Sequence, residues 1–288
     1  MALYVLLVYV ILKGRKTEPK LRSTFFTLCL SLAVADFESC AHQWILSRPR
    51  FANLWFDGYT MFDPLFSYLI VSAAYQIAIT QSIGLFLLTL NRLTAIVSPE
   101  HYEARWTKSR LRFAIAFQWL LPICIFTIGM LPTGYGQYEF RQINNGTRVI
   151  FLQNKDPYTF KFMLGRTVLL AFFNGSSMVL YAVMAILIPY RLKSKTQAHT
   201  ELKLTACCFL LTLQSGAYIA HALYMIYVRE GKFLQFDIAT LYVLMDLVAY
   251  ANPYVVLFFS SLATNNSSLA IHVTAQHQHH QSNRGGHH

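Results

Sequence analysis

Residues 64–91, PLFSYLIVSAAYQIAITQSIGLFLLTLN, decide the fold class, because this stretch contains no Asp, Glu, Lys or Arg. A helix of about 20 residues crosses a hydrocarbon core of about 30 Å, so the stretch is long enough to span a bilayer. Five further stretches of comparable length carry little or no charge: 23–46, 113–131, 167–190, 204–228 and 238–260. The sequence therefore predicts an all-α, polytopic membrane protein.

The first apolar stretch, residues 1–12, is shorter than the others. Twelve helical residues cover about 18 Å, which is too little to cross a bilayer. We interpret the stretch as a shortened first helix and expect that the gene model starts late; a secretory signal is disfavoured, because no basic residue precedes it. The prediction is a seven-transmembrane domain over residues 1–260, with the third helix prolonged to 64–97, and a disordered cytoplasmic tail at 261–288.

The segments that connect the predicted helices alternate in their density of positive charge. The denser set carries 13 Lys or Arg in 38 residues and lies at 13–22, 98–112 and 191–203. The other set carries 9 in 61 residues and lies at 47–63, 132–166 and 229–237. Because basic loops face the cytoplasm, the chain should begin outside the cell and end inside it, in the plasma membrane. The net charge of +11 then indicates topology and attraction to anionic lipids, and we expect no nucleic-acid partner.

Composition also bears on the class of activity. Only 13% of the residues are charged, compared with about 25% in ordinary soluble domains, so a soluble enzyme is disfavoured. No His-x-x-Glu-His or Gly-x-Ser-x-Gly motif supports a membrane enzyme. A transporter or channel is the alternative to a receptor, although seven is an odd number for paired inverted repeats and no two predicted helices share matched Gly or Pro breaks.

Polar side chains in the second predicted helix suggest a functional cluster. Asp36 lies near mid-membrane, where an ionised side chain is costly and is therefore a functional candidate. A structural Asp that hydrogen-bonds between helices is the equally weighted alternative. Glu38 and His42 lie one turn apart and nearer the outside, where they can pair with each other or touch a ligand.

Polar and aromatic residues on three predicted helices indicate a ligand pocket that opens to the outside. They are Tyr75, Ile79 and Ser82 on the third helix, Gln214, Tyr218 and His221 on the sixth, and Tyr242, Asp246 and Tyr250 on the seventh. In lipid such groups must face protein or a water-filled cavity, and interhelical hydrogen bonds without a ligand are the alternative. The outer half of the third helix holds no acid, so we expect a neutral or weakly polar organic ligand.

Cysteines and sequons complete the candidate sites. All five cysteines lie within apolar stretches: Cys29, Cys40, Cys124, Cys207 and Cys208. Thiols there behave as small hydrophobic groups, so we expect no extracellular disulfide, no metal site and no cofactor. The long outer loop contains the sequon Asn145-Gly146-Thr147, and we expect a glycan on Asn145. The sequon at Asn174 falls inside the fifth predicted helix and should remain unmodified.

Several motifs resemble those of rhodopsin-like G-protein-coupled receptors. They are Leu32-Ala-Val-Ala-Asp36, the pair Asn91-Arg92 that closes the third helix, and Asn252-Pro253 in the seventh. The match is incomplete, because Asn91 replaces the usual acid, Val256 replaces the usual Tyr, and the sixth helix lacks a Pro.

The chain resembles nematode serpentine chemosensory receptors of the class gamma superfamily, which includes class V, more closely. The resemblance rests on residues 81–102, QSIGLFLLTLNRLTAIVSPEHY, and on the segment from Asp246 to Ser261. It implies a sensory receptor, in the plasma membrane or a sensory cilium, that binds a small molecule outside and activates a heterotrimeric G protein inside.

The same resemblance assigns roles to individual residues. Arg92 would form the cytoplasmic lock and contact the G protein. The basic loop 98–112, with Arg105 and Lys108, would present the rest of the cytoplasmic site. Asp36 and Asn252 would form a polar mid-membrane cluster that links the pocket to the cytoplasmic face.

Overall fold

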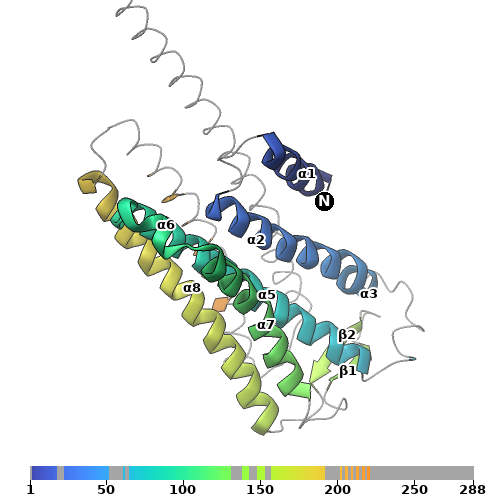
Figure 1. Cartoon of the computed structure of the whole chain (residues 1–288). Helices are drawn as coiled ribbons and strands as arrows, with labels where there is room; N and C mark the ends of the chain where they lie inside the picture. The colour runs from blue at the N-terminus through green and yellow to red at the C-terminus, as the bar shows by residue number, and fades with distance from the viewer. Residues whose placement is uncertain are drawn as a thin grey trace, which may run out of the picture.

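A computed structural model gives the fold of the chain (Figure 1). It describes residues 2–17, 23–51, 61, 65–130, 138–142, 148–152 and 157–191, together with positions 202, 205, 206, 209, 212, 213, 216, 217, 219 and 220. The predicted seventh helix and the tail at 261–288 lie outside the described residues. The described long elements are helices, as expected for segments whose backbone groups must be satisfied internally in lipid.

The N-terminal part consists of α1 (Ala2–Thr17) and a second helix in three pieces. The pieces are α2 (Thr24–Ala41), the π-helix η2 (His42–Ser47) and α3 (Arg48–Phe51). α1 packs on α2, and Arg15 Nη2 donates a hydrogen bond to Thr27 Oγ1 at 2.7 Å. α1 therefore continues past the apolar residues 1–12 into the basic segment that follows them.

The centre of the bundle is α5 (Leu65–Val97), which spans most of the predicted stretch 64–97. A short connection with η3 (Pro99–His101) and α6 (Tyr102–Arg105) leads into α7 (Lys108–Met130), which contains Pro122. α5 contacts α2, α7 and α8, so it is the element around which the other described helices are arranged.

Two features of the fifth helix and the loop before it differ from the sequence prediction. Strands β1 (Tyr138–Gln142) and β2 (Arg148–Leu152) form an antiparallel hairpin in which Tyr138 pairs with Leu152. The helix α8 (Pro157–Arg191) then begins ten residues before the predicted boundary at 167. A proline suits the first turn of a helix, because the missing N–H would be unsatisfied there in any case.

Contacts between side chains fix the relative directions of the helices. Asp36 of α2 and His42 of η2 meet Gln81 and Ile70 of α5, respectively, so the second helix and α5 run antiparallel. Tyr75 and Ser82 of α5 meet Arg166 and Asn174 of α8, so α5 and α8 run parallel. The loops therefore alternate between two ends of the bundle.

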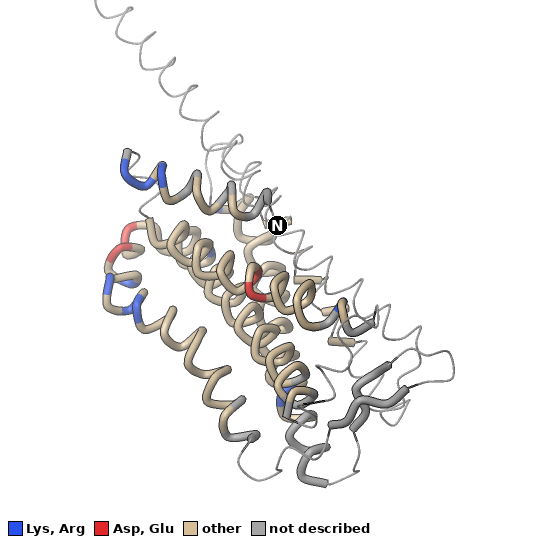
Figure 2. Tube along the Cα trace, turned by 90° about the vertical axis from the view of Figure 1, so that its right-hand side faces the viewer, with Lys and Arg blue, Asp and Glu red and all other residues tan. Residues whose placement is uncertain are grey.

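We call these ends the hairpin end and the basic end. The hairpin contacts α3 and α5 at the first. The end of α1, the segment 98–112 and the last residue of α8 lie at the second end, where the Lys and Arg residues of these segments lie near one another along the trace (Figure 2). The described basic residues there are Lys13, Arg15, Lys16, Arg105, Lys108, Arg110, Arg112 and Arg191. This separation agrees with the alternation of charge in the sequence.

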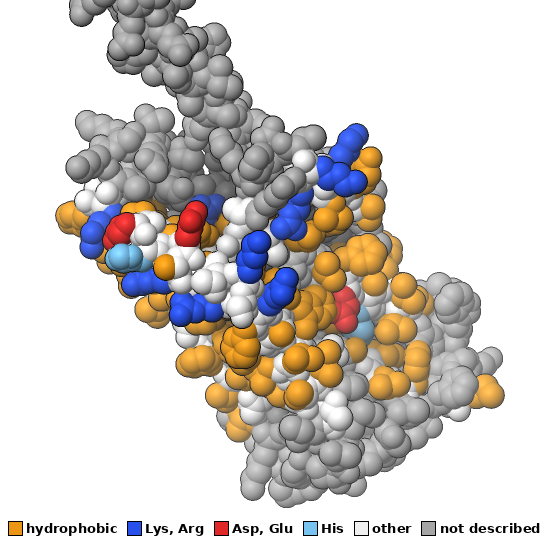
Figure 3. All heavy atoms as spheres, viewed as in Figure 1, with side chains coloured by type: hydrophobic (Ala, Val, Ile, Leu, Met, Phe, Trp, Pro, Cys, Tyr) orange, Lys and Arg blue, Asp and Glu red, His pale blue; other side chains and the backbone are white. Residues whose placement is uncertain are grey.

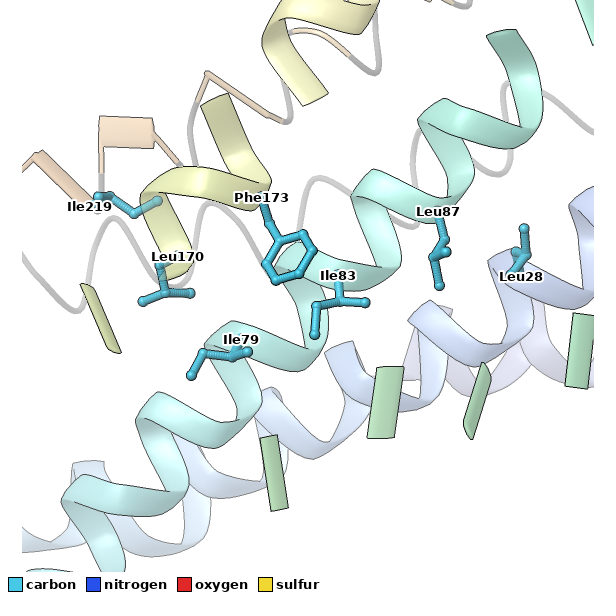
Figure 4. Close-up of a cluster of buried hydrophobic side chains, with 7 residues drawn as sticks. All are labelled: Leu28, Ile79, Ile83, Leu87, Leu170, Phe173 and Ile219. Atoms are coloured by element: carbon cyan, nitrogen blue, oxygen red, sulfur yellow. The ribbon is translucent and has the colours of Figure 1, made fainter. Parts of the chain in front are cut away.

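The largest hydrophobic cluster joins α2, α5 and α8 (Figure 4). Its buried members are Leu28, Ile79, Ile83, Leu87, Leu170, Phe173 and Ile219. Ile219 belongs to the predicted sixth helix, so that segment contributes to the same core. A second cluster joins Ile96 of α5 to Tyr181, Met184 and Ile188 of α8 nearer the basic end.

The outward faces of the helices are apolar. Exposed large apolar side chains include Val34 and Phe37 on α2, Phe113, Phe117 and Leu120 on α7, and Val168, Phe172, Val179 and Ile186 on α8. Figure 3 shows hydrophobic side chains across the middle of one face, with Lys and Arg toward the basic end. Among the described residues, Thr24–Leu46, Ser72–Val97 and Leu164–Arg191 are long and apolar enough to cross a membrane. Such a surface suits lipid and not water.

Candidate functional site

At the hairpin end, Tyr75 of α5 lies against two polar residues of α8. The Arg166 guanidinium carbon is 5.5 Å from the centroid of the Tyr75 ring. The Thr167 side chain, from the next position of α8, lies beside the Tyr75 hydroxyl group. Arg166 and Thr167 are both buried, with 4% and 0% of their surface exposed. The cation Arg166 therefore lies against Tyr75, which was predicted to bind the ligand. The sequence analysis had assigned Arg166 to the outer loop.

Further polar groups lie near this level of the bundle. Ser72, one turn before Tyr75 on α5, is 1% exposed, and its Oγ has no hydrogen-bond partner among the described residues. On the second helix, His42 Nε2 lies 2.9 Å from the Ile70 carbonyl oxygen. His42 begins the π-helix η2, a local widening that is frequent at functional sites. His42 therefore contacts the α5 backbone.

Ile79 and Ser82, the other two predicted residues of the third helix, lie one turn or more deeper. One makes apolar contacts and the other makes a polar contact. Ile79 is 1% exposed and packs in the hydrophobic cluster beside Leu170 and Phe173. Ser82 accepts a hydrogen bond from Asn174 Nδ2 at 2.7 Å. Asn174 is buried between α5 and α8.

Near the middle of the bundle, Asp36 is fully buried and accepts a hydrogen bond from Gln81 Nε2 at 2.7 Å. The contact joins α2 to α5. It gives the Asp36 carboxyl group the interhelical hydrogen bond that is expected if Asp36 has a structural role. Gln81 lies in the quoted third-helix segment but was not among the predicted site residues. Glu38 is half-buried, and its Oε2 has no hydrogen-bond partner among the described residues.

A second polar network lies where α2, α5 and α7 meet. Ser31 Oγ donates to Gln118 Oε1 at 2.8 Å and accepts from Trp119 Nε1 at 3.1 Å. Gln118 Nε2 donates to the Thr80 carbonyl oxygen at 3.4 Å. Gln118 is fully buried. We call these four residues the Gln118 network, and the sequence analysis did not identify it.

The network depends on the close approach of helices at Gly84. A Cβ atom at this position would lie 2.6 Å from Gln118 Nε2 and 3.0 Å from Leu32 Cδ1. Real Cβ atoms do not approach other atoms so closely, so an alanine here would have to displace the Gln118 amide. Glycine at this position therefore lets α5 lie close to the Gln118 and Leu32 side chains, and the reason is packing, not an unusual backbone angle.

Toward the basic end, Arg92 of α5 stacks on an aromatic ring of α2. The guanidinium carbon lies 3.8 Å from the centroid of Phe25, within the range of a cation–π interaction. Arg92 is half-buried. The residue that resembles the receptor lock thus contacts the start of the second helix.

The connection between α5 and α7 folds back onto the end of α5. Asn91 Nδ2 donates to Tyr102 Oη at 2.9 Å, and Trp106 Nε1 donates to Thr94 Oγ1 at 2.7 Å. Asn91 is 1% exposed. These contacts fix the connection immediately beside Arg92.

The predicted cytoplasmic residues of this connection are accessible. Arg105 and Lys108 are exposed, and Arg110 Nη1 donates to the carbonyl oxygens of Ala104 and Arg105 at 3.2 and 3.3 Å. The basic side chains therefore lie on an ordered turn that is available to a partner.

The remaining predicted site residues lie outside the described part of the chain. They are Gln214, Tyr218, His221, Tyr242, Asp246, Asn252 and the sequon residue Asn145. Within the described residues, no cluster of His, Cys, Asp and Glu has the arrangement of a metal site.

Arg166 is the site residue whose omission matters most, and the sequence did contain a signal for it. The pair Asp156-Pro157 resembles a helix start, with an N-cap residue followed by proline at the first helical position. A helix that begins at Pro157 includes Arg166. The predicted helix began at residue 167, because it was limited to uncharged residues, and it therefore excluded Arg166.

Comparisons with known proteins identify the family of the chain. The family model described as "Serpentine type 7TM GPCR chemoreceptor Srv" matches residues 1–270. "Serpentine receptor class V-1" of Caenorhabditis elegans is 24% identical over 149 residues, which cover 51% of this chain and 46% of that receptor. The match thus spans about half the length of the curated relative. The predicted resemblance is confirmed, with class V favoured over class gamma, and the chain belongs to the Srv family of serpentine, seven-transmembrane, G-protein-coupled chemoreceptors.

Proposed function

We propose that this receptor binds a small organic molecule among the helices at the hairpin end and activates a heterotrimeric G protein at the basic end. The observation that carries the proposal is the position of two polar sites at opposite ends of one bundle. Tyr75 and Arg166 meet at the hairpin end, whereas Arg92 and the folded connection lie at the basic end. Multi-pass receptors need such an arrangement to pass a signal across lipid.

The hairpin-end site supports ligand binding because its polar groups are buried or partly buried and come from different helices. Tyr75 belongs to α5, and Arg166 and Thr167 belong to α8. Polar side chains within a membrane must face protein or a water-filled cavity, and they mark ligand pathways. The predicted partners Tyr218, Tyr242 and Asp246 would complete the pocket from the sixth and seventh helices.

The basic-end site supports G-protein coupling through position and charge. Arg92 lies at the end of α5, and the exposed Arg105 and Lys108 follow on the folded connection. Basic loops face the cytoplasm, which supports a G-protein site at this end. The N-terminus is then outside, the segment 261–288 forms a cytoplasmic tail, and the receptor resides in the plasma membrane.

Signal transfer is a shift between helix arrangements. A ligand moves this equilibrium by no more than its differential affinity for the two states. α5 contacts both sites, since it carries Tyr75 and Arg92. The Asp36–Gln81 contact lies between them, and with Asn252 it would form the polar link.

Guanine-nucleotide exchange on a panel of Gα subunits, measured in membranes that contain the full-length receptor, tests the proposal. We expect receptor-dependent exchange in the wild type and a loss of at least tenfold in Arg92→Gln. The matched control is Arg48→Gln, which removes an arginine stacked on Trp44 at 4.0 Å near the hairpin end. Its exchange activity should equal that of the wild type.

Two results would contradict the proposal. One is equal exchange in Arg92→Gln and Arg48→Gln at matched surface expression. The other is solute uptake or current from the purified receptor in liposomes without any exchange activity, which would favour the transporter or channel alternative.

A further inference from the structure

We propose that the start of α7 is a binding site for one phosphoinositide lipid, whose phosphorylated headgroup lies against Ser109, Arg110 and Arg112. The inference rests on the orientation given in the proposed function, in which the basic end faces the cytoplasm, and it does not depend on G-protein coupling. A general attraction of basic loops to anionic lipids would involve many places, whereas this site has a defined position and a defined class of headgroup.

Polar and basic side chains surround the first turn of α7 (Lys108–Met130). Ser109, Arg110 and Arg112 are all exposed. Residues three or four apart are neighbours on a helix surface, so Ser109 lies beside Arg112. For the same reason, Ser109 and Arg110 both lie one turn before Phe113. A hydroxyl group and two guanidinium groups are therefore presented on the outer surface of one helical turn.

The outer surface of α7 beyond this turn is apolar. Phe113 is 74% exposed, and Phe117, Leu120 and Ile123 continue the exposed apolar surface along the helix. A contiguous apolar surface of this kind suits the acyl chains of a lipid. Figure 3 shows the same order on one face of the molecule, with Lys and Arg side chains bordering hydrophobic ones. A lipid whose headgroup binds at Ser109 would therefore have its acyl chains beside Phe113.

The two arginines of this turn are accessible to an anion. Arg110 Nη1 donates to two carbonyl oxygens of the preceding connection, at 3.2 and 3.3 Å, and these contacts hold the guanidinium in place. A guanidinium has five N–H groups, so others can bind an anion. The acids of the connection, Glu100 and Glu103, are exposed and form no ion pair with a described residue. They therefore do not occupy Arg110 or Arg112.

These groups favour a headgroup that carries several phosphates. Arginine binds phosphate through two parallel hydrogen bonds, and the Ser109 hydroxyl group can donate a further one. Basic clusters immediately cytoplasmic of a membrane helix are typical of phosphoinositide sites. Phosphatidylserine carries an ammonium group that two arginines would repel, whereas an inositol bisphosphate headgroup offers one phosphate to each arginine.

The experiment titrates the full-length receptor, purified in detergent, with three probes. They are phosphatidylinositol bisphosphate, phosphatidylserine and soluble inositol trisphosphate. Native mass spectrometry gives the number of molecules bound and the apparent Kd. We expect one phosphatidylinositol bisphosphate per receptor, bound about tenfold more tightly than phosphatidylserine, because the attraction grows with the charge of the headgroup. The soluble headgroup should bind more weakly than the lipid, because it lacks the acyl chains.

Variants of the first turn locate the site. The double variant Arg110→Gln, Arg112→Gln should weaken phosphoinositide binding by about tenfold or more, because both guanidinium groups are removed. Ser109→Glu keeps both arginines but places a negative charge where a phosphate binds, and it should weaken binding similarly. An acid in the first turn of a helix is favourable, so this second variant should fold. Arg191→Gln is the matched control: it removes an exposed arginine at the same end, from α8, and should leave the affinity unchanged.

Four results would overturn the inference. Equal affinity of the wild type for the two lipids does so whether or not the variants fold. Equal affinity for the soluble headgroup and the phosphoinositide would identify an inositol phosphate, not a lipid. Unchanged binding in folded Ser109→Glu would place the lipid elsewhere. Equal weakening by Arg191→Gln and the double variant would show a diffuse effect of charge. Gα exchange in the same preparation tests the receptor function separately.

Discussion

Asn91 and Tyr102 are joined by two hydrogen bonds: Asn91 Nδ2 donates to Tyr102 Oη at 2.9 Å, and Tyr102 Oη donates to Asn91 Oδ1 at 3.2 Å. An ionised carboxylate can only accept hydrogen bonds, whereas an amide both donates and accepts. Asn91, which stands where related receptors carry an acid, is therefore suited to a reciprocal contact with a hydroxyl group. Its neighbour Arg92 stacks on Phe25.

Removing the Tyr102 hydroxyl should weaken G-protein coupling. Tyr102→Phe removes both hydrogen bonds to Asn91 and loosens the turn that presents Arg105 and Lys108. A hydrogen bond contributes about 0.5–1.5 kcal/mol, so we expect ligand-stimulated nucleotide exchange to fall about two- to tenfold at equal surface expression. Tyr190→Phe is the control, because Tyr190 is 84% exposed. Equal exchange in both variants would show that the Tyr102 contact does not support coupling.

Gly84→Ala should destabilise the bundle. The new methyl group would displace the Gln118 amide and with it the hydrogen bonds to Ser31 and the Thr80 carbonyl. Overpacking of this kind costs about 1–3 kcal/mol, and it should lower the thermal unfolding midpoint of the receptor in nanodiscs.

Gly175→Ala is the matched control for this variant. A Cβ atom at Gly175 of α8 meets nothing within 4 Å, and alanine is a better helix former than glycine by about 0.5–1 kcal/mol. The control should therefore keep or raise the midpoint. A Gly84→Ala midpoint at or above that of Gly175→Ala would contradict the close packing of α5 on α7.

The Asp36–Gln81 contact should appear as an energetic coupling. Asp36→Ala and Gln81→Ala each remove one side of a buried hydrogen bond, at a cost of about 1–3 kcal/mol. Because the two residues contact each other, the double variant should be less destabilised than the sum of the single variants. Thermal midpoints of the four proteins give the comparison. Additive effects would mean that the hydrogen bond does not form in the membrane.

Glycosylation tests which side of the membrane the long loop faces. We expect the receptor from eukaryotic cells to lose mass on treatment with an N-glycosidase, and Asn145→Gln to abolish this shift. Ser176→Ala, which disrupts the sequon of the buried Asn174, should leave the shift unchanged. A shift that persists in Asn145→Gln, or its absence from the wild type, would refute the predicted topology of residues 132–166.

The helices were largely predictable because every segment that crosses lipid must be apolar and about 20 residues long. Uncharged stretches long enough to cross a bilayer located α2, α5, α7 and most of α8. The π-helix at His42–Ser47 was not predictable, because nothing in the apolar pattern of the sequence distinguishes it from an α-helix. The hairpin was also missed, since ten strand residues within a long loop leave a weak alternating pattern.

The candidate site was predictable only in part, because some of its residues are recognisable only from their contacts with other helices. Tyr75 and Arg92 stood out through their residue type and their place on a long helix. Arg166 and Gln118 did not, because the first lies beyond a boundary defined by the absence of charge, and the second is one polar residue on an apolar helix. Their importance depends on which neighbours they meet, and that information resides in the packing of helices distant in sequence.

The Gln118 network has a consequence for how the receptor moves. It ties α2, α5 and α7 together through buried hydrogen bonds, so none of the three can slide without stranding a polar group. These three helices therefore form one unit. α8 joins this unit through the buried Asn174–Ser82 hydrogen bond and runs from the hairpin end to Arg191 at the basic end. A ligand that displaced one end of α8 would therefore also shift its other end, beside the folded connection on the opposite side of the lipid.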